Sequence, residues 1–190
     1  IKKPVVPNPY NLLMLNRDRK IILTNDQQKA IKQINNSLKK DKFDPFLLHG
    51  VTGSGKTEVF IESVKNAIKF GKSAIVLLPE ISITPQIAGR FKSVFGDKVA
   101  VWHSKLTQSS RGWIWKKICE GDYKIIVGAR SAIFSPLKNL GLIIVDEEQE
   151  NAFKQSAPDP KYHAREVALM RGKINDCAVI LSSATPSIES

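Results

Sequence analysis

The sequence predicts an open, mostly parallel α/β sheet with helices packed on it. From residue 24 onward, short apolar runs alternate with helical stretches, as in strand–helix–strand units. The runs are rich in β-branched residues, as expected for parallel strands that are buried on both faces. We expect these strands at 46–49, 73–78, 99–102, 124–128, 142–145 and 178–182.

One helix is predicted before the first strand. Thr24 and Gln27 have the spacing of a capping box, and an apolar stripe follows them at Ala30, Ile31, Ile34 and Leu38. We expect further helices near 56–70, 84–94, 111–120 and 163–173.

The chain is predicted to hold one domain, at residues 23–190, after a tether at residues 1–22. Pro4, Pro7 and Pro9 discourage regular structure in the tether. The chain lacks an initiator Met and is expected to be a fragment of a larger protein. No signal peptide or membrane-length apolar run is found, and Cys119 and Cys177 are predicted to be buried thiols, so we expect a cytoplasmic location.

The net charge of +11 suits a polyanionic partner such as nucleic acid. A basic surface that only keeps the protein soluble is the alternative, and charge alone does not separate the two.

Residues 50–57 match the phosphate-binding pattern GxxxxGK[ST] in full, between a predicted strand and a predicted helix. Main-chain N–H groups and the helix N-terminus are expected to hold the phosphates of ATP. Lys56 should reach the β- and γ-phosphates, and Thr57 should bind Mg²⁺. A glycine-rich turn with an incidental lysine is the alternative. The predicted nucleotide-binding residues are Gly50, Val51, Thr52, Gly53, Ser54, Gly55, Lys56 and Thr57.

An acidic box follows the predicted strand 142–145. Asp146 is expected to bind Mg²⁺, and Glu147 to polarise the water that attacks the γ-phosphate. Four consecutive carboxyl or amide side chains at the end of a buried strand need such a reason, because unpaired buried charge is costly. An acidic loop that only ends the strand is the alternative. Lys56, Asp146 and Glu147 are therefore the predicted catalytic residues.

Three further segments follow predicted strands. Ser183 and Thr185 are candidates for sensing the γ-phosphate, or they belong to a hydroxyl-rich loop that stops at Pro186. Thr84 is expected to cap a helix, whose free N–H groups near Gln86 would also suit a nucleic-acid phosphate. Arg90, Arg130 and Ser131 are candidate strand contacts, and the two arginines have solvated surface charges as their alternative.

Aromatic and basic residues are mixed between the acidic box and Ser183. They are Phe153, Lys154, Tyr162, His163 and Arg165. Aromatic rings stack on unpaired bases and basic groups meet phosphates, whereas packing of Phe153 and Tyr162 under a surface loop is the alternative that the chemistry alone slightly favours. Gln27 also has two interpretations, which are closing the capping box and reading the edge of adenine.

Taken in order, these motifs resemble those of superfamily 2 helicases and, within them, the PriA family of primosomal replication-restart DNA helicases. The run Pro79 to Gln86 and the element Tyr162-His163-Ala164-Arg165 carry the more specific part of this resemblance. It implies a P-loop NTPase lobe with a RecA-like, three-layer fold, an ATP- and Mg²⁺-dependent 3′-to-5′ DNA helicase, and replication-restart proteins as partners. It also implies that Gln27 lies at adenine and that the aromatic-rich segment couples DNA to hydrolysis.

The sequence departs from that family pattern at Gln149, where the family usually has His, a residue that links hydrolysis to motion. A second RecA-like lobe and the zinc-binding cysteines of the family are not in these 190 residues. We therefore expect the first lobe alone, poorly active by itself, with zinc only in the remainder of the parent protein. An RNA helicase or double-strand translocase, and a nucleotide-gated binding module without motor activity, are the alternatives.

Overall fold

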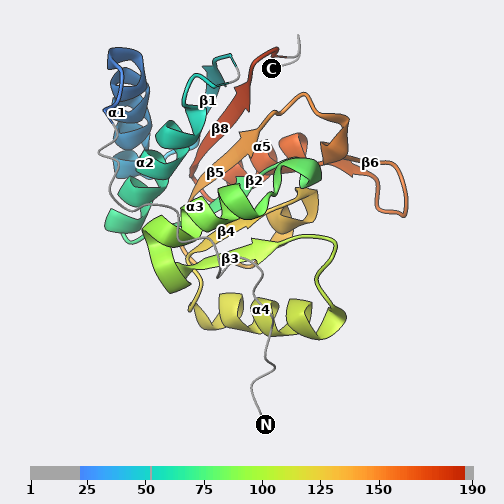
Figure 1. The fold of residues 1–190 in the computed structure, drawn as a ribbon. Coiled ribbons are helices and arrows are strands. Elements are labelled where there is room, and N and C mark those ends of the chain that lie inside the picture. The colour runs from blue at the N-terminus through green and yellow to red at the C-terminus, as the bar shows by residue number, and fades with distance from the viewer. Residues whose placement is uncertain (1–21, 52, 187–190) are drawn as a thin grey trace.

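A six-stranded parallel sheet forms the centre of the chain in this computed structural model, which describes residues 22–51 and 53–186 (Figure 1). The strands lie in the order β1-β8-β5-β2-β4-β3, and each neighbouring pair is parallel. The predicted open parallel sheet is therefore confirmed. The strands are β1 (Asp44–His49), β2 (Ser73–Leu77), β3 (Val99–Trp102), β4 (Ile125–Gly128), β5 (Leu140–Asp146) and β8 (Ala178–Ser183).

Helices cover both faces of this sheet, which gives three layers. On one face lie α1 (Asn25–Lys40), α2 (Lys56–Lys69) and α3 (Pro85–Phe95), and they share a core with one set of strand side chains. On the other face lie α4 (Gln108–Glu120), α5 (Ala164–Ile174) and the 3-10 helix η3 (Arg130–Phe134). The three-layer α/β prediction is thus confirmed.

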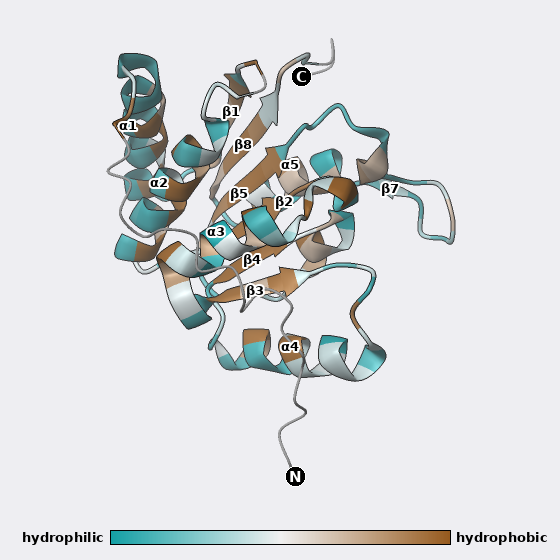
Figure 2. Cartoon of the chain, in the orientation of Figure 1, coloured by the Kyte–Doolittle hydropathy of each residue, from teal (hydrophilic) through white to brown (hydrophobic). Residues whose placement is uncertain are grey.

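The two cores follow from the alternation of side chains along each strand. In β2, Ala74 and Val76 belong to the core under α1 and α2, while Ile75 and Leu77 belong to the core under α4 and α5. All four are fully buried. The brown strands between helices with teal outer surfaces in Figure 2 reflect this pattern, which explains why the central strand segments are mainly apolar.

Helix starts agree with the capping signals of the sequence. Thr24 and Gln27 form the predicted capping box at α1, and Thr84 accepts a hydrogen bond from Ile87 N at the start of α3. Helix α4 begins three residues before the predicted start, because Thr107 caps it through Ser110 N. A local hydroxyl cap therefore decided the boundary where the apolar pattern was weak.

A short antiparallel pair was missed from the sequence. Strands β6 (Lys154–Gln155) and β7 (Tyr162–His163) pair beside the main sheet and project from it (Figure 1). Two residues per strand leave no alternating pattern to detect. We call this pair and its connecting loop, residues 154–163, the β6–β7 hairpin.

Two further expectations concern residues outside the sheet. The predicted tether lies outside the described residues apart from Ile22, and so does Thr52 of the phosphate loop.

The prediction of two buried thiols was wrong for Cys119, which is exposed at the end of α4, and right for Cys177. Among the described residues, no helix is both long enough and apolar enough to cross a membrane.

Candidate nucleotide and magnesium site

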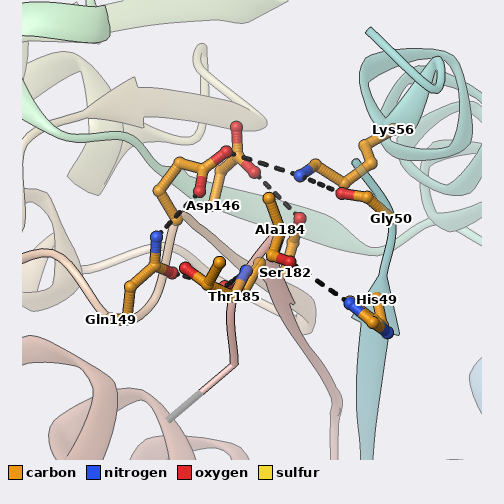
Figure 3. A network of polar contacts seen from close by, with 10 residues as sticks. His49, Gly50, Lys56, Asp146, Gln149, Ser182, Ala184 and Thr185 are labelled. Atoms are coloured by element: carbon orange, nitrogen blue, oxygen red, sulfur yellow. Dashed lines mark hydrogen bonds and ion pairs between the residues drawn. The ribbon is translucent and has the colours of Figure 1, made fainter. Parts of the chain in front are cut away.

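The predicted motifs meet at one edge of the sheet, at the carboxyl ends of three adjacent strands. His49 of β1 lies opposite Ser183 of β8, and Asp146 of β5 lies opposite Ser182. The segments that follow these strands therefore converge, although they are far apart in the sequence (Figure 3). Ligands of open α/β sheets bind at this edge.

The phosphate loop connects β1 to α2 with the conformation that its glycines allow. Gly53 and Gly55 have φ angles of 82° and 80°, which favour glycine. A Cβ atom at Gly55 would also lie 2.5 Å from Gln27 Nε2. Gly55 is the N-cap of α2 and offers no side chain to its first N–H groups. These donors, together with the positive end of the helix dipole, suit phosphate oxygens.

Lys56 joins the loop to the acidic box. Its ammonium group donates to Gly50 O at 2.7 Å and forms an ion pair with Glu147 Oε1 at 3.4 Å (Figure 3). The Lys56 side chain is only 10% exposed, so its charge is directed into the site. The two motifs that the sequence separates by about 90 residues therefore face each other.

Asp146 ends β5 in a largely buried position. Burial raises the pKa of its carboxyl group above the ordinary value, and the negative charge of Glu147 raises it further. A hydrogen bond from Ser182 Oγ at 2.9 Å and the positive charge of Lys56 act in the opposite direction. A buried carboxylate of this kind is stabilised by a bound cation.

These residues fit magnesium rather than a metal held by protein side chains alone. The described residues contain no cluster of three or more His, Cys, Asp or Glu side chains able to hold a metal ion. Mg²⁺ is usually bound through one or two protein oxygens, with water and phosphate oxygens completing the shell. Asp146 and the hydroxyl of Thr57, directly after Lys56, are the residues that would hold it.

Glu147 has a left-handed backbone conformation, with φ at 50°. Such strained positions in non-glycine residues cluster at functional sites. Its carboxylate is held on both oxygens, by Lys56 at Oε1 and by Gln149 Nε2 at Oε2, the second at 2.9 Å. The predicted catalytic carboxylate is therefore oriented by its neighbours.

Gln149 connects this carboxylate to the segment after β8. Its Oε1 accepts from Ser183 Oγ at 2.6 Å, and Ser183 Oγ accepts from Thr185 N at 2.9 Å (Figure 3). The predicted sensing residues Ser183 and Thr185 thus belong to the same network as Glu147. Gln149, where the resemblance led us to expect His, therefore contacts both Glu147 and Ser183.

Gln27 combines a capping role with a contact to the phosphate loop. Its Oε1 accepts from Thr24 N at 2.9 Å, which closes the capping box, and its Nε2 donates to Ser54 O at 3.0 Å. The capping interpretation is confirmed. That Gln27 recognises adenine stays a prediction, and the fold does place this residue beside the phosphate loop.

Two predicted strand-contact residues are already bonded within the protein. Arg90 on α3 forms an ion pair with Glu58 on α2, a partner that the sequence did not predict, while the Arg90 side chain stays 38% exposed. Arg130 donates from Nη1 to Lys154 O at 3.0 Å and so connects η3 to the β6–β7 hairpin. Ser131 is exposed and accepts from Trp102 Nε1 at 3.1 Å, and Gln86 is exposed in the first turn of α3.

The aromatic and basic segment divides between core and surface. Phe153 is fully buried among core side chains, so its interpretation as a base-stacking ring was wrong for this structure. The ring of Tyr162 packs edge-on against the ring of Phe134, with 5.1 Å between the ring centroids. Lys154 is exposed. Together with Lys161 and His163, Tyr162 and Lys154 line a pocket on the hairpin.

Arg165 is a buried residue and does not offer its charge to a ligand at the surface. It pairs with Glu148 Oε2 at 3.0 Å, and Glu148 is fully buried next to Glu147. His163 caps α5 by accepting from Arg165 N at 3.3 Å. No sequence pattern predicts the Glu148–Arg165 pair, because the two residues are 17 positions apart in the chain.

The fold and this site define a nucleotide-binding domain of the helicase type, and the sequence comparison agrees. Residues 24–190 match the profile of the DEAD/DEAH box helicase family, so the chain belongs to that family. The chain is similar to the Replication restart protein PriA of Bacillus subtilis (strain 168), with 48% identity over 98% of the chain and 23% of that protein. It is 52% identical to the Chlamydia pneumoniae protein of the same name, over 87% of the chain and 22% of that protein.

Solved structures support the same fold. The chain is similar to RecG bound to a three-way DNA junction, with a TM-score of 0.65 and 25% identity, covering 87% of this chain and 21% of RecG. The fold also matches the helicase MrfA, with a TM-score of 0.62 and 17% identity, covering 90% of this chain and 24% of MrfA. The chain spans less than a quarter of the length of these relatives.

Proposed function

We propose that residues 23–190 are the first RecA-like lobe of a larger ATP-dependent DNA helicase, and that this lobe binds ATP and Mg²⁺. The observation that carries the proposal is the contact between Lys56 and Glu147, which joins the phosphate loop to the acidic box. The uncapped N-terminus of α2 beside them supports phosphate binding.

Each residue of the site has a role in this proposal. The main-chain N–H groups of residues 50–57 and Lys56 bind the triphosphate, and Thr57 and Asp146 hold the metal. Bound Mg²⁺ supplies positive charge against the phosphates during transfer. Glu147, held on both oxygens, accepts a proton from the attacking water. Gln27 lies beside the loop and is proposed to read adenine.

DNA is the proposed second substrate. The protein carries a net charge of +11, the relatives are named as replication restart proteins, and the similar RecG structure is bound to a DNA junction. We propose that the parent protein unwinds DNA in the 3′-to-5′ direction during replication restart in the cytoplasm. Thr84, Gln86, Ser131, Lys154 and Tyr162 are the proposed strand contacts. The second lobe and a zinc-binding region would lie in the remainder of the parent protein.

Nucleotide binding is tested with a Lys56→Ala variant of the 190-residue chain. The loss of a charge-assisted contact should weaken Mg²⁺–ATP binding by about ten- to a hundredfold, measured by calorimetric titration. Lys69→Ala, on the exposed end of the same helix, is the matched control and should bind as the unmodified chain does. Equal affinities for all three proteins would contradict the proposal.

The motor assignment needs the longer protein. Its ATP turnover should rise more with forked DNA than with RNA, and Glu147→Gln should abolish most of this turnover while nucleotide still binds. Stronger stimulation by RNA would favour the RNA-helicase alternative. Fork binding with turnover unaffected by Glu147→Gln would favour a nucleotide-gated binding module.

A further inference from the structure

Arg90 and Glu58 connect two helices on the same face of the sheet. Glu58 lies in the first turn of α2, directly after Thr57, and its side chain is 14% exposed. Arg90 lies on α3 and pairs with this carboxylate. The packing of α3 holds Arg90 in place beside α2, because Ala88 and Phe91 on either side of it are buried in the core that the two helices share.

The position of Glu58 poses an electrostatic problem for phosphate binding. An acidic side chain in the first turn favours the helix by itself, because it complements the helix dipole. The same negative charge opposes a triphosphate that binds at this end of α2. Lys56 does not solve the problem, because the same ammonium group already serves the triphosphate and Glu147 in the proposed site.

We propose that Arg90 neutralises Glu58 and thereby keeps the phosphate-binding end of α2 positive. Arg90 is then a positioning residue for nucleotide binding and does not touch the nucleotide. This inference rests on the proposed function of residues 50–57. It assigns a role in the nucleotide site to a residue on α3, the helix that Thr84 begins.

Charge-removing variants of the 190-residue chain test the inference by titration with Mg²⁺–ATP. Arg90→Met leaves the Glu58 carboxylate without its partner, and binding should weaken about three- to tenfold. Glu58→Gln removes the negative charge, so its affinity should not fall. The double variant Arg90→Met/Glu58→Gln should return to within about twofold of the unmodified chain. The defect of Arg90→Met should also shrink at high salt, which screens charge.

The matched control is Lys65→Met, which breaks the pair between Lys65 and Glu62 further along the same helix. It should leave affinity unchanged, because the partly exposed Glu62 carboxylate lies one turn further from the phosphate loop than Glu58. Melting temperatures separate affinity from folding. Unchanged affinity of Arg90→Met, or a double variant as weak as Arg90→Met, would overturn the inference. If Lys56→Ala also bound as the unmodified chain does, the proposed function itself would fail.

Discussion

Gln149 donates a hydrogen bond from Nε2 to Oε2 of Glu147 across 2.9 Å. The same amide accepts from Ser183 through its Oε1, so one side chain joins the acidic box to the segment after β8. A carboxamide presents a donor and an acceptor together at any pH near neutrality. The connection is therefore made here without the imidazole that the resemblance led us to expect.

The first prediction concerns this amide. In the longer protein, Gln149→Leu should lower kcat about ten- to a hundredfold, because Glu147 loses a hydrogen bond to a charged group. The KM for ATP should change little, since residues 50–57 are untouched. Gln149→His should keep turnover at pH 8 and lose it as the imidazole protonates near pH ~6.5, because the cation accepts no hydrogen bond from Ser183. A kcat for Gln149→Leu equal to that of the unmodified protein would exclude this role.

The second prediction concerns the buried ion pair. Arg165→Met removes the guanidinium that pairs with the fully buried Glu148 carboxylate, so the free energy of unfolding should fall by about 3–5 kcal/mol in urea titrations. Adding Glu148→Met should recover much of that loss. Lys154→Met, an exposed change in the adjoining hairpin, is the control and should be neutral. The idea fails if the single and double variants are equally unstable.

The third prediction is a pH dependence at Glu80, which follows Pro79 after β2. Hydrogen bonds from Ser104 lower the pKa of this carboxyl group below its ordinary value. A lowered pKa in the folded state stabilises the protein above the unfolded pKa of ~4.3, and this stability is lost as pH falls through the folded pKa. Glu80→Gln should therefore lower the melting temperature at pH 7, but not at pH values below the folded pKa. The decrease should be at most about 2 °C, because Glu80 is exposed and solvent screens its contacts. An equal decrease at every pH would show that charge is not the cause.

The fourth prediction separates the two thiols. Burial raises the pKa of Cys177 to about 11, whereas Cys119 is exposed on α4. Titration of the folded protein with a disulfide reagent at pH 8 should modify Cys119 alone, because the thiolate is the reactive form and Cys177 is inaccessible. Cys119→Ser should then react only after unfolding. Rapid labelling of that folded variant would show that Cys177 is not sealed in the core.

Local patterns in the sequence were sufficient for the sheet, the phosphate loop and the acidic box. Strands that are buried on both faces appear in the sequence as apolar runs. Glycines followed by a lysine and a hydroxyl residue are the pattern of a phosphate-binding loop. Thr24 and Thr84 predict the starts of the helices that they cap, because a capping side chain accepts a hydrogen bond from an N–H group only two or three residues further along. Each of these features depends on residues that are neighbours in the chain.

Only the tertiary structure decided what the charged and aromatic side chains do. Arg90 pairs with Glu58, Arg165 pairs with Glu148, and Phe153 lies in the core, whereas the sequence had made all three candidates for contact with a nucleic-acid strand. The partners of these side chains lie on other elements. The periodicity of one helix does not predict which residues of another element it will contact. The physical reason is that burial and charge pairing depend on the packing of whole elements, whereas caps, loops and strands depend on local backbone geometry.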